Sequence, residues 1–370
     1  MEITVKKADL VKELSLGQGV VEKKTTIPVL SNVLVEAREG EVILTVTDLE
    51  LGIRSSCPAV VKKSGATTVP ARKLLDYVRL LPDAELAIKV SENHSANIVC
   101  GRARTRIAGM ARDNFPELPK MPAALTSIPA GLLANVISKT IFSIANEESR
   151  YTLTGGLMIL KEGALVMVAT DGHRLAHIEM THSFEGISGE LKALVPKKAM
   201  VEILKMATEA GSSASVGFAT DENHLFFECG KRLLIARRLT GQFPDFERVL
   251  PKEKGHSVVL NREEVTAAVR RVSQFADDRS HAVRLELSSD ELKLVSSGSD
   301  VGESEESLPI EYGGEKMKIG FNSQYLLEFL GVAETETVEI DFRGEDSAGQ
   351  LRLPAAEGVN YRYVVMPMRI

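Results

Sequence analysis

Residues 69–75 read VPARKLL, and residues 195–201 read VPKKAMV, which repeats the first stretch in outline 126 residues further on. A fainter copy, GFNSQYLL, occupies residues 320–327 and begins 124 residues after Pro196. In each copy an extended segment leads into an amphipathic stretch. A period close to a third of the 370 residues indicates three domains of one design rather than short stacked repeats. Each domain is then long enough to bury its own core.

Two shorter pairs of segments follow the same period. VTD at 46–48 is echoed by ATD at 169–171, and NFP at 114–116 is echoed by QFP at 242–244. Proline and charged residues mark two linkers between the copies, at 118–124 and 250–255. We therefore predict three domains with the boundaries 1–122, 123–252 and 253–370.

Hydrophobic spacing predicts the same elements in each third. Apolar stripes at helical spacing predict one helix per third, at 74–81, 201–207 and 326–330. An earlier helix precedes each of these and is predicted to begin at a capping residue, Asp9 in the first third and Asn261 in the last.

The segments between these helices alternate as strands do. Residues 42–46, 165–168 and 292–295 show this pattern, and Asp171-Gly172 predicts a type I′ hairpin turn. Sheets built from such hairpins are antiparallel. The pattern predicts an α+β fold, with antiparallel sheets and helices gathered on one side.

Composition places the chain among ordinary globular proteins, at 44% hydrophobic and 26% charged residues. No apolar run approaches the length of a membrane span, and the N-terminus lacks a signal-peptide pattern. Three scattered cysteines, Cys57, Cys100 and Cys229, fit a reducing compartment. We expect a cytoplasmic protein with no membrane partner. A net charge of −6 argues against coating nucleic acid with the whole surface but leaves room for a local basic surface.

Motifs for catalysis and cofactors are missing from the sequence. There is no Walker A loop, no G-x-G-x-x-G turn, no G-x-S-x-G elbow and no H-E-x-x-H helix. His173 and His177 have a spacing that suits zinc on a helix, but they follow a predicted hairpin. Asp48 and Asp171 occupy the same place in two repeats, which favours turn-forming roles over a carboxylate site. We expect no enzymatic activity, no metal and no cofactor.

Four segments together resemble the bacterial DNA sliding clamp family, the beta subunits of the replicative DNA polymerase III holoenzyme. They are YVVMPMR at 363–369, ATDGHRL at 169–175, FPDFERVLP at 243–251 and ATTVPARK at 66–73. The resemblance spans the whole chain. It implies three clamp domains per chain and two chains paired head to tail in a closed six-domain ring. Helices would line the hole, and the ring would encircle duplex DNA and tether a polymerase to it.

Basic residues on corresponding helices predict a positive lining that meets DNA phosphates. The residues chosen for DNA contact are Lys24, Arg72, Arg79, Arg150, Lys197 and Lys198. Further cations on or after the predicted helices are Lys139, Lys205, Arg262, Arg270 and Arg271. Taken singly, each residue fits a solvated helix face equally well. Contacts to the DNA backbone carry no sequence information, so sliding without specificity is expected.

The resemblance also implies a pocket that takes a short apolar motif from partner proteins. Those partners would be replicative and repair polymerases, the clamp loader and other proteins with the motif. The matching positions are Leu153, Thr170, Gly172, His173, Arg174, Leu175, Pro244, Arg248, Val249, Val364, Val365, Met366, Pro367, Met368 and Arg369. On the residues alone, the apolar chain end also fits a strand packed into the last domain's core. Methionines there suit a surface that adapts to varied partners.

The head-to-tail pairing that the resemblance implies would bring together complementary charges of the first and last thirds. On the residues alone, these charge runs fit a solvated surface equally well. The acidic residues are Asp300, Glu303, Glu305 and Glu306. The basic residues are Lys73, Arg102, Arg104 and Arg106, and apolar contacts are assigned to Ile107 and Phe275. Such charges favour register and steer association more than they add affinity. Two head-to-tail contacts of this kind close a ring.

Two other functions stay open on the residues alone. One is a DNA-modifying or hydrolytic enzyme that uses the region of Asp171 and His173, and its turnover would be lost in His173→Ala. The other is a peptide-binding scaffold that does not enclose DNA, which predicts no retention on DNA of any topology.

Overall fold

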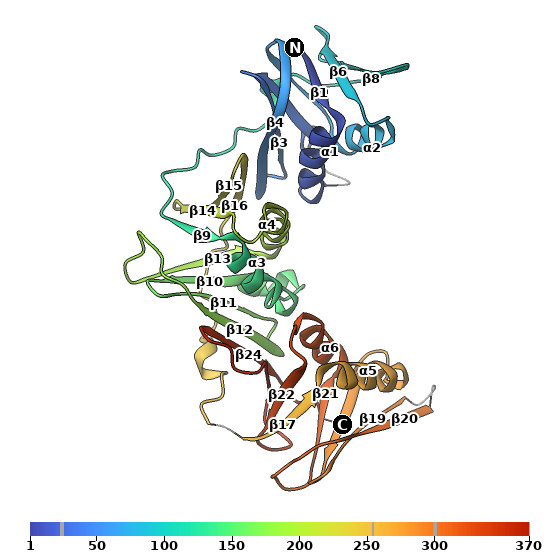
Figure 1. Cartoon of the computed structure of the whole chain (residues 1–370), viewed down its shortest axis with the longest axis vertical. Coiled ribbons are helices and arrows are strands. Elements are labelled where there is room, and N and C mark those ends of the chain that lie inside the picture. Colours follow the sequence, from blue (N-terminus) through green and yellow to red (C-terminus); the bar gives the residue numbers. More distant parts are fainter. Residues whose placement is uncertain (23–25, 254, 299–301, 370) are drawn as a thin grey trace. The chain divides into compact units, whose positions relative to one another are not determined.

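The computed structural model describes residues 1–22, 26–253, 255–298 and 302–369. The chain forms two compact units, each with its own sheets and helices (Figure 1). The first unit holds residues 1–134 and 198–238, and the second holds residues 135–197 and 239–370. Lys24 and Asp300, predicted for DNA and for the chain–chain contact, lie outside the described residues.

One antiparallel 12-stranded sheet organises the first unit. Its main path is β8 (Ala103–Ile107), β7 (Ala96–Cys100), β6 (Glu85–Val90), β1 (Glu2–Lys6), β4 (Leu51–Lys63), β16 (Arg232–Arg237), β15 (His224–Cys229), β14 (Ser215–Thr220) and β9 (Thr126–Pro129). Three further strands branch from β4, namely β3 (Glu41–Thr47), β2 (Asn32–Arg38) and β5 (Gly65–Pro70). Because β4 is 13 residues long, it pairs with β1 and β3 and also with β16. This strand joins the first repeat to part of the second.

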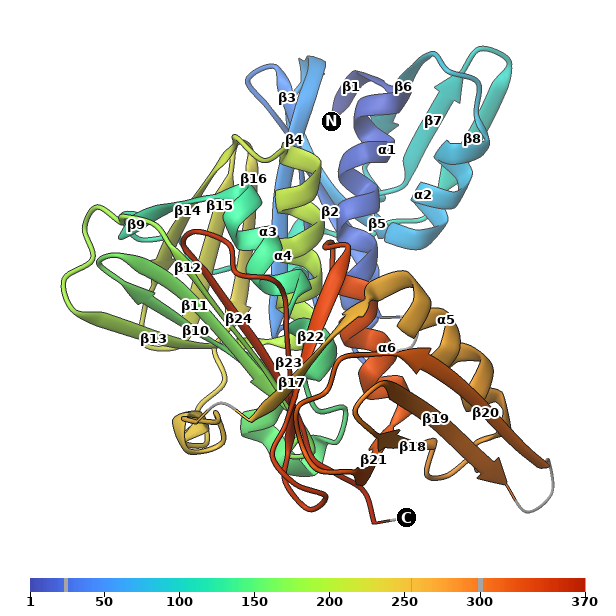
Figure 2. The ribbon, with the colours of Figure 1, turned by 60° about the horizontal axis from the view of Figure 1, so that its bottom comes forward.

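Helices α1 (Lys7–Leu16) and α2 (Ala71–Leu80) lie side by side in the first unit (Figure 2). The predicted stripe of α2 is buried at Leu74, Leu75 and Val78. Asp9 does not cap α1: the helix begins at Lys7, and Asp9 lies in its first turn. An acidic residue there still interacts favourably with the helix dipole.

Two antiparallel sheets organise the second unit. The 8-stranded sheet runs β13 (Glu190–Pro196), β10 (Gly155–Lys161), β11 (Ala164–Thr170), β12 (Arg174–Thr181), β24 (Val359–Val365), β23 (Gly349–Arg352), β22 (Thr337–Phe342) and β17 (His256–Asn261). The 4-stranded sheet runs β20 (Gly302–Pro309), β19 (Glu291–Gly298), β18 (Ala282–Leu287) and β21 (Met317–Asn322). The pairing of β12 with β24 brings residues far apart in sequence into one sheet.

Four helices follow the predicted positions in the second and third repeats. They are α3 (Ala130–Ser138), α4 (Lys197–Ala210), α5 (Arg262–Val272) and α6 (Ser323–Val332). The predicted cap of α5 is confirmed, because the Asn261 side chain accepts hydrogen bonds from the backbone N–H groups of Glu263 and Glu264. The α+β class with antiparallel sheets is confirmed as well. No helix in the described ranges has both the length and the hydrophobicity that a membrane span requires.

The two repeated aspartates form the same turn, although not the predicted type. Asp171 Oδ1 accepts hydrogen bonds from the backbone N–H groups of His173 (2.9 Å) and Arg174 (3.0 Å). Asp48 does the same for Glu50 (3.0 Å) and Leu51 (2.7 Å). Gly172 has a φ of 90°, but Asp171 is not among the residues with positive φ, so the type I′ prediction was wrong. The carboxylate closes the turn instead, which confirms the turn-forming interpretation.

Candidate functional site

The buried guanidinium of Arg174 is the centre of the site, at the start of β12. Its Nε donates to Asp171 Oδ2 at 3.0 Å, and its Nη2 donates to the carbonyl of Phe142 at 2.6 Å. Its Nη1 donates to Glu328 on α6 and to the hydroxyl of Tyr363 on β24. One side chain therefore ties the 171–174 turn to α6 and β24. All of these groups belong to the second unit.

The charge on Arg174 is held firmly despite burial. Burial by itself would lower the pKa of Arg174, but Tyr363 and Glu328 outweigh it, and the pKa lies above its ordinary value. The guanidinium also lies over the ring of Tyr325, 4.2 Å from the ring centroid. Burial raises the pKa of Tyr363, so this hydroxyl stays protonated. Arg174 therefore keeps its charge and Tyr363 keeps its proton near neutral pH, so this pair acts as a fixed support.

A mostly apolar cavity of about 120 Å³ lies beside this support. Backbone hydrogen bonding shapes its rim, since the N–H of Met366 donates to the carbonyl of His173 at 2.9 Å. The side chain of Met366 is 40% exposed. The residues that line the cavity are Leu153, Thr170, Gly172, His173, Arg174, Leu175, Pro244, Phe246, Val249, Val364 and Met366.

Most of the residues predicted for a peptide pocket therefore come together, and five do not line the cavity. Val365 is fully buried, because neighbours on a strand point to opposite faces and Val364 takes the cavity side. Arg248 is exposed and pairs with Asp245 at 2.8 Å. The backbone N–H of Met368 donates to Gly320 on β21, so the chain end turns away from the cavity. Pro367 and Arg369 flank that contact and are also outside the lining.

Phe246 was not predicted as a lining residue, although it lies inside the quoted segment 243–251. Its ring packs against His177, with 5.7 Å between the ring centroids. The signal was available, because an aromatic residue two positions after Pro244 lies within reach of the same surface. His177 itself is buried on β12, and burial lowers its pKa to about 4.

The predicted DNA-contacting cations that lie among the described residues are anchored to backbone or side-chain oxygens. In the first unit, Arg72 donates to the carbonyl of Val21 at 2.8 Å, and Lys198 donates to Asp48 and to the carbonyl of Val20. Arg79 is exposed and donates to Ser15 Oγ at 3.0 Å. Asp48, the turn aspartate of the first repeat, therefore also positions Lys198 of the second repeat.

Two predicted cations lie in the second unit. Arg150 donates to the carbonyl of Asp171 at 2.7 Å, and Lys197 donates to Asn146 Oδ1 at 2.7 Å. Burial lowers the pKa of Lys197, and the positive charge of Arg174 acts in the same direction. Both cations therefore lie close to the turn that borders the apolar cavity.

Lys139 corrects the predicted basic lining. Its side chain is 7% exposed, and its ammonium donates to the carbonyl of Val332 at 3.0 Å and to Glu334 at 3.4 Å. Val332 ends α6, where unpaired carbonyls favour a cation. Lys139 therefore caps a helix, and its ammonium is not presented to DNA phosphates. Its position in sequence after a helix could not reveal this, because the partner helix is almost 200 residues away.

The predicted chain–chain residues fall into paired and unpaired groups. Glu305 and Glu306 already pair within the chain, with Lys293 and Arg271 respectively. In the described part of the chain, the exposed side chains of Glu303, Lys73, Arg102 and Arg104 have no ion pair. Ile107 is buried, with 7% of its surface exposed, so it offers little apolar contact to a partner. Phe275 is half-buried.

Leu80 is an apolar residue that sequence reasoning missed. It ends α2 and is 85% exposed, on the same helix as Lys73. Its position outside the apolar stripe of Leu74, Leu75 and Val78 could have indicated from the sequence that Leu80 is exposed. A single exposed leucine is ordinary on a protein surface, so Leu80 by itself does not mark a contact with another chain.

Comparison with known proteins covers the whole chain. Residues 1–119, 127–245 and 247–369 match the N-terminal, central and C-terminal domains of the DNA polymerase III beta subunit. A relative from Pseudomonas aeruginosa, a beta sliding clamp, is 35% identical over 373 residues, with 100% of both chains covered.

Two solved structures agree with this similarity. The DNA polymerase III subunit beta from Pseudomonas aeruginosa has a TM-score of 0.93 at 34% identity, and both chains are covered to 100%. The sliding clamp from Bartonella birtlesii, bound to griselimycin, has a TM-score of 0.93 at 34% identity and the same coverage.

Proposed function

Because the chain belongs to the DNA polymerase III beta subunit family, the beta sliding clamps, we propose that two copies pair head to tail into a ring around duplex DNA. The chain is a processivity factor for a DNA polymerase. The observation that carries this is the match of all three family domains along one chain. The clamp domains are assigned to residues 1–122, 123–252 and 253–370. We assign the protein to the cytoplasm, where a polymerase tether would act on DNA, and we assign it no catalytic role, because tethering requires none.

Charge supports holding by enclosure rather than by tight contact. With a net charge of −6, the chain gains little from general attraction to DNA. Arg72, Arg79, Arg150, Lys197 and Lys198 are the cations we assign to phosphates. In each of these side chains at least one nitrogen donates a hydrogen bond within the protein. That bond holds the side chain in place and limits how closely the cation can approach the DNA. Few neutralised phosphates mean weak grip and easy sliding.

Retention on circular DNA tests enclosure directly. The protein is loaded by a clamp loader onto a nicked circular plasmid at moderate salt, and the plasmid is then cut at one site. We expect stable retention on the circle and rapid loss from the linear form, because an enclosed duplex escapes only through an end. Gel filtration of the DNA-bound fraction before and after cutting measures this. Equal retention on both forms would reject the ring, and no retention on either would favour a scaffold that does not enclose DNA.

The contact between chains is assigned to the unpaired charges. Lys73, Arg102 and Arg104 on the first domain would face Glu303 on the last domain of the partner, with Phe275 as an apolar contact. Glu305 and Glu306 stay in this assignment, although each would share its charge with Lys293 or Arg271. Leu80 adds exposed apolar surface to the basic side. Charges that have no ion pair among the described residues of the monomer can steer association without first breaking one.

The apolar cavity beside Arg174 is assigned to the short apolar motif of partner proteins. Those partners are replicative and repair polymerases, the clamp loader and other proteins that carry the motif. Support comes from the mostly apolar lining, the rigid charged cluster beneath it and the half-exposed methionine at its rim. A thioether adapts to side chains of different shape, which suits several partners.

Met366→Lys should weaken binding of a polymerase-derived motif peptide at least about tenfold, since a charge replaces an apolar wall of the cavity. The measurement is fluorescence anisotropy with a labelled peptide. Deleting residues 366–370 should weaken binding similarly. Arg369→Lys is the matched control, because Arg369 does not line the cavity. Both chain-end variants should keep the solution mass of the dimer. Unchanged peptide affinity in Met366→Lys would reject the pocket assignment.

A further inference from the structure

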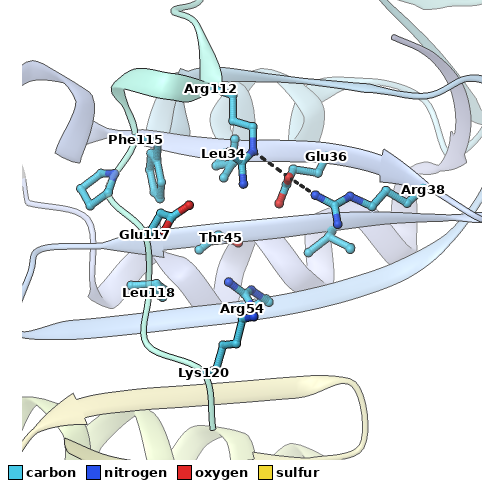
Figure 3. A pocket seen from close by; sticks show the side chains of 12 residues that line it. Leu34, Glu36, Arg38, Thr45, Arg54, Arg112, Phe115, Glu117, Leu118 and Lys120 are labelled. Atoms are coloured by element: carbon cyan, nitrogen blue, oxygen red, sulfur yellow. Dashed lines mark hydrogen bonds and ion pairs between the residues drawn. The ribbon is translucent and has the colours of Figure 1, made fainter.

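A second cavity, of about 270 Å³, lies in the first unit on one face of β2, β3 and β4 (Figure 3). Strand alternation puts Leu34, Glu36 and Arg38 of β2 on this face. Thr45 of β3 lies on the same face, because the strand pairing sets it opposite Leu34 of β2 and opposite Arg54 of β4. The opposite face of the same strands carries buried core residues, among them Val33, Val35 and Val42.

A strap of chain, residues 112–120, forms one side of this cavity (Figure 3). Phe115 anchors the strap, since it is buried against Leu34. Leu118 lies where a side chain on Gly52 would be, 2.8 Å from an added Cβ, so Gly52 allows the strap to cross β4 closely. The strap and the sheet together make a lined groove rather than an open surface.

Positive charge exceeds negative charge in the groove. Arg38 and Arg112 both donate to one oxygen of Glu36, at 2.8 Å and 3.1 Å, and this buried carboxylate serves them both. Arg54 and Lys120 line the groove as well, and within the described residues neither has an ion pair or a side-chain hydrogen bond. Glu117 is the remaining acid of the lining. Four cations thus face two carboxylates.

Thr45 provides a separate sign of a ligand. Its side chain is 2% exposed and lines the groove, and its hydroxyl has no hydrogen-bond partner among the described residues. A buried polar group without a partner costs free energy, so such groups are rare in native proteins. Here the unpaired hydroxyl lies on the strand next to the unpaired guanidinium of Arg54.

We propose that this groove binds an acidic peptide segment, with one carboxylate held by Arg54 and Thr45 and an adjacent apolar side chain packed against the strap. Arg54 and Lys120 supply the charge, and the Thr45 hydroxyl donates to the carboxylate. Leu34, Ile43 and Phe115 supply the apolar wall. The site is independent of the apolar cavity beside Arg174, which lies in the other unit.

The lining favours a peptide over a nucleic acid. Glu36 already sits between two arginines, which shows that a carboxylate fits this arrangement. Glu117 at the rim would repel a run of phosphates but leaves room for a single carboxylate. The apolar wall contributes little to a phosphate backbone, whereas it would bury a leucine or valine side chain next to the acid.

A phage-displayed random heptapeptide library, selected on the full-length protein, tests the proposal. Counter-selection on Arg54→Gln removes peptides that bind elsewhere, including those in the cavity beside Arg174. We expect the surviving peptides to share an Asp or Glu next to an apolar residue. One such peptide is then synthesised with a fluorophore, and its affinity is measured by anisotropy together with that of its Gln or Asn counterpart.

The expected affinity changes are specific. Arg54→Gln should weaken the peptide at least about tenfold, and Thr45→Val, which keeps the shape of the side chain, about fivefold. Thr45→Val should not lower the melting temperature, because the hydroxyl has no partner to lose. Arg237→Gln removes an exposed arginine of the same unit outside the groove and should leave the affinity unchanged.

Three results would overturn the proposal. The first is that no peptide survives counter-selection. The second is survival of peptides without a carboxylate, or equal binding of the amide counterpart. The third is that no peptide binds, while a 12-base-pair DNA duplex binds and Arg54→Gln abolishes that binding. This result would assign the groove to nucleic acid.

Discussion

Arg174→Leu should lower the free energy of unfolding of the second unit by about 3 kcal/mol. The substitution leaves Glu328 and Asp171 without the cation that they share, and it leaves the carbonyl of Phe142 without a donor. Removing one partner of a buried charged cluster costs more than the net contribution of the pair, because Asp171, whose side chain is 15% exposed, stays desolvated, whereas Glu328 is 44% exposed and regains water. The loss should be local, at the junction of the 171–174 turn, α6 and β24.

Hydrogen exchange measures this loss where it occurs. Amides of β12 and β24 should exchange much faster in Arg174→Leu, while those of β14 and β15 in the first unit should not change. Binding of the motif peptide should fall in parallel, since the turn shapes the rim of the apolar cavity.

Arg248→Leu is the matched control for Arg174→Leu. Arg248 is 85% exposed and, among the residues that the structure describes, pairs only with Asp245, and exposed pairs of this kind contribute little. The free energy of unfolding of the Arg248→Leu variant should differ from that of the wild type by less than about 0.5 kcal/mol. A similar small change in Arg174→Leu would show that the cluster is not a structural support.

Lowering the pH from 6.5 to 4 should remove about 3 kcal/mol of stability through His177. Burial lowers the pKa of this imidazole from 6.5 to about 4, with Arg362 and Lys161 acting in the same direction. Below pH 6.5 the unfolded chain binds a proton on His177, while the folded chain stays neutral until about pH 4. Protonation therefore favours the unfolded chain, and stability falls as the pH falls through this window.

The measurement is urea denaturation at several pH values between 4 and 7, comparing the wild type with His177→Leu. The variant should lack this part of the pH dependence, because a leucine cannot titrate. Carboxylates that titrate in the same range are common to both proteins and cancel in the difference. His173→Leu is the control, since His173 is exposed. If His177→Leu and wild type lose stability equally over this range, the imidazole does not carry the effect.

Local patterns allowed much of the fold to be predicted. The stripe in α2, the cap of α5 and the alternation of the strands each depend on residues within one element. The repeat spacing extended these local signals to three domains. Predictions that required backbone dihedral angles were weaker: Asp9 lies inside α1, and Asp171 closes its turn with its carboxylate.

The candidate site shows the same division. Segments 169–175 and 363–369 could be assigned to one pocket only through the resemblance to known clamps. Pairing of β12 with β24 explains why they meet. Val365 points away from the cavity, whereas Phe246 points into it, and such orientations depend on register and packing.

By itself the sequence determined the threefold repeat, the class of fold and the family, because these depend on residue types at fixed spacing. Only the tertiary structure decided which charges are available. Lys139 is bound at the end of α6, Arg174 is surrounded by the groups it supports, and Arg54 and Lys120 have no ion pair within the described part of the chain. The physical reason is that a charge acts through distance and burial, and both are set by segments that lie far away along the chain.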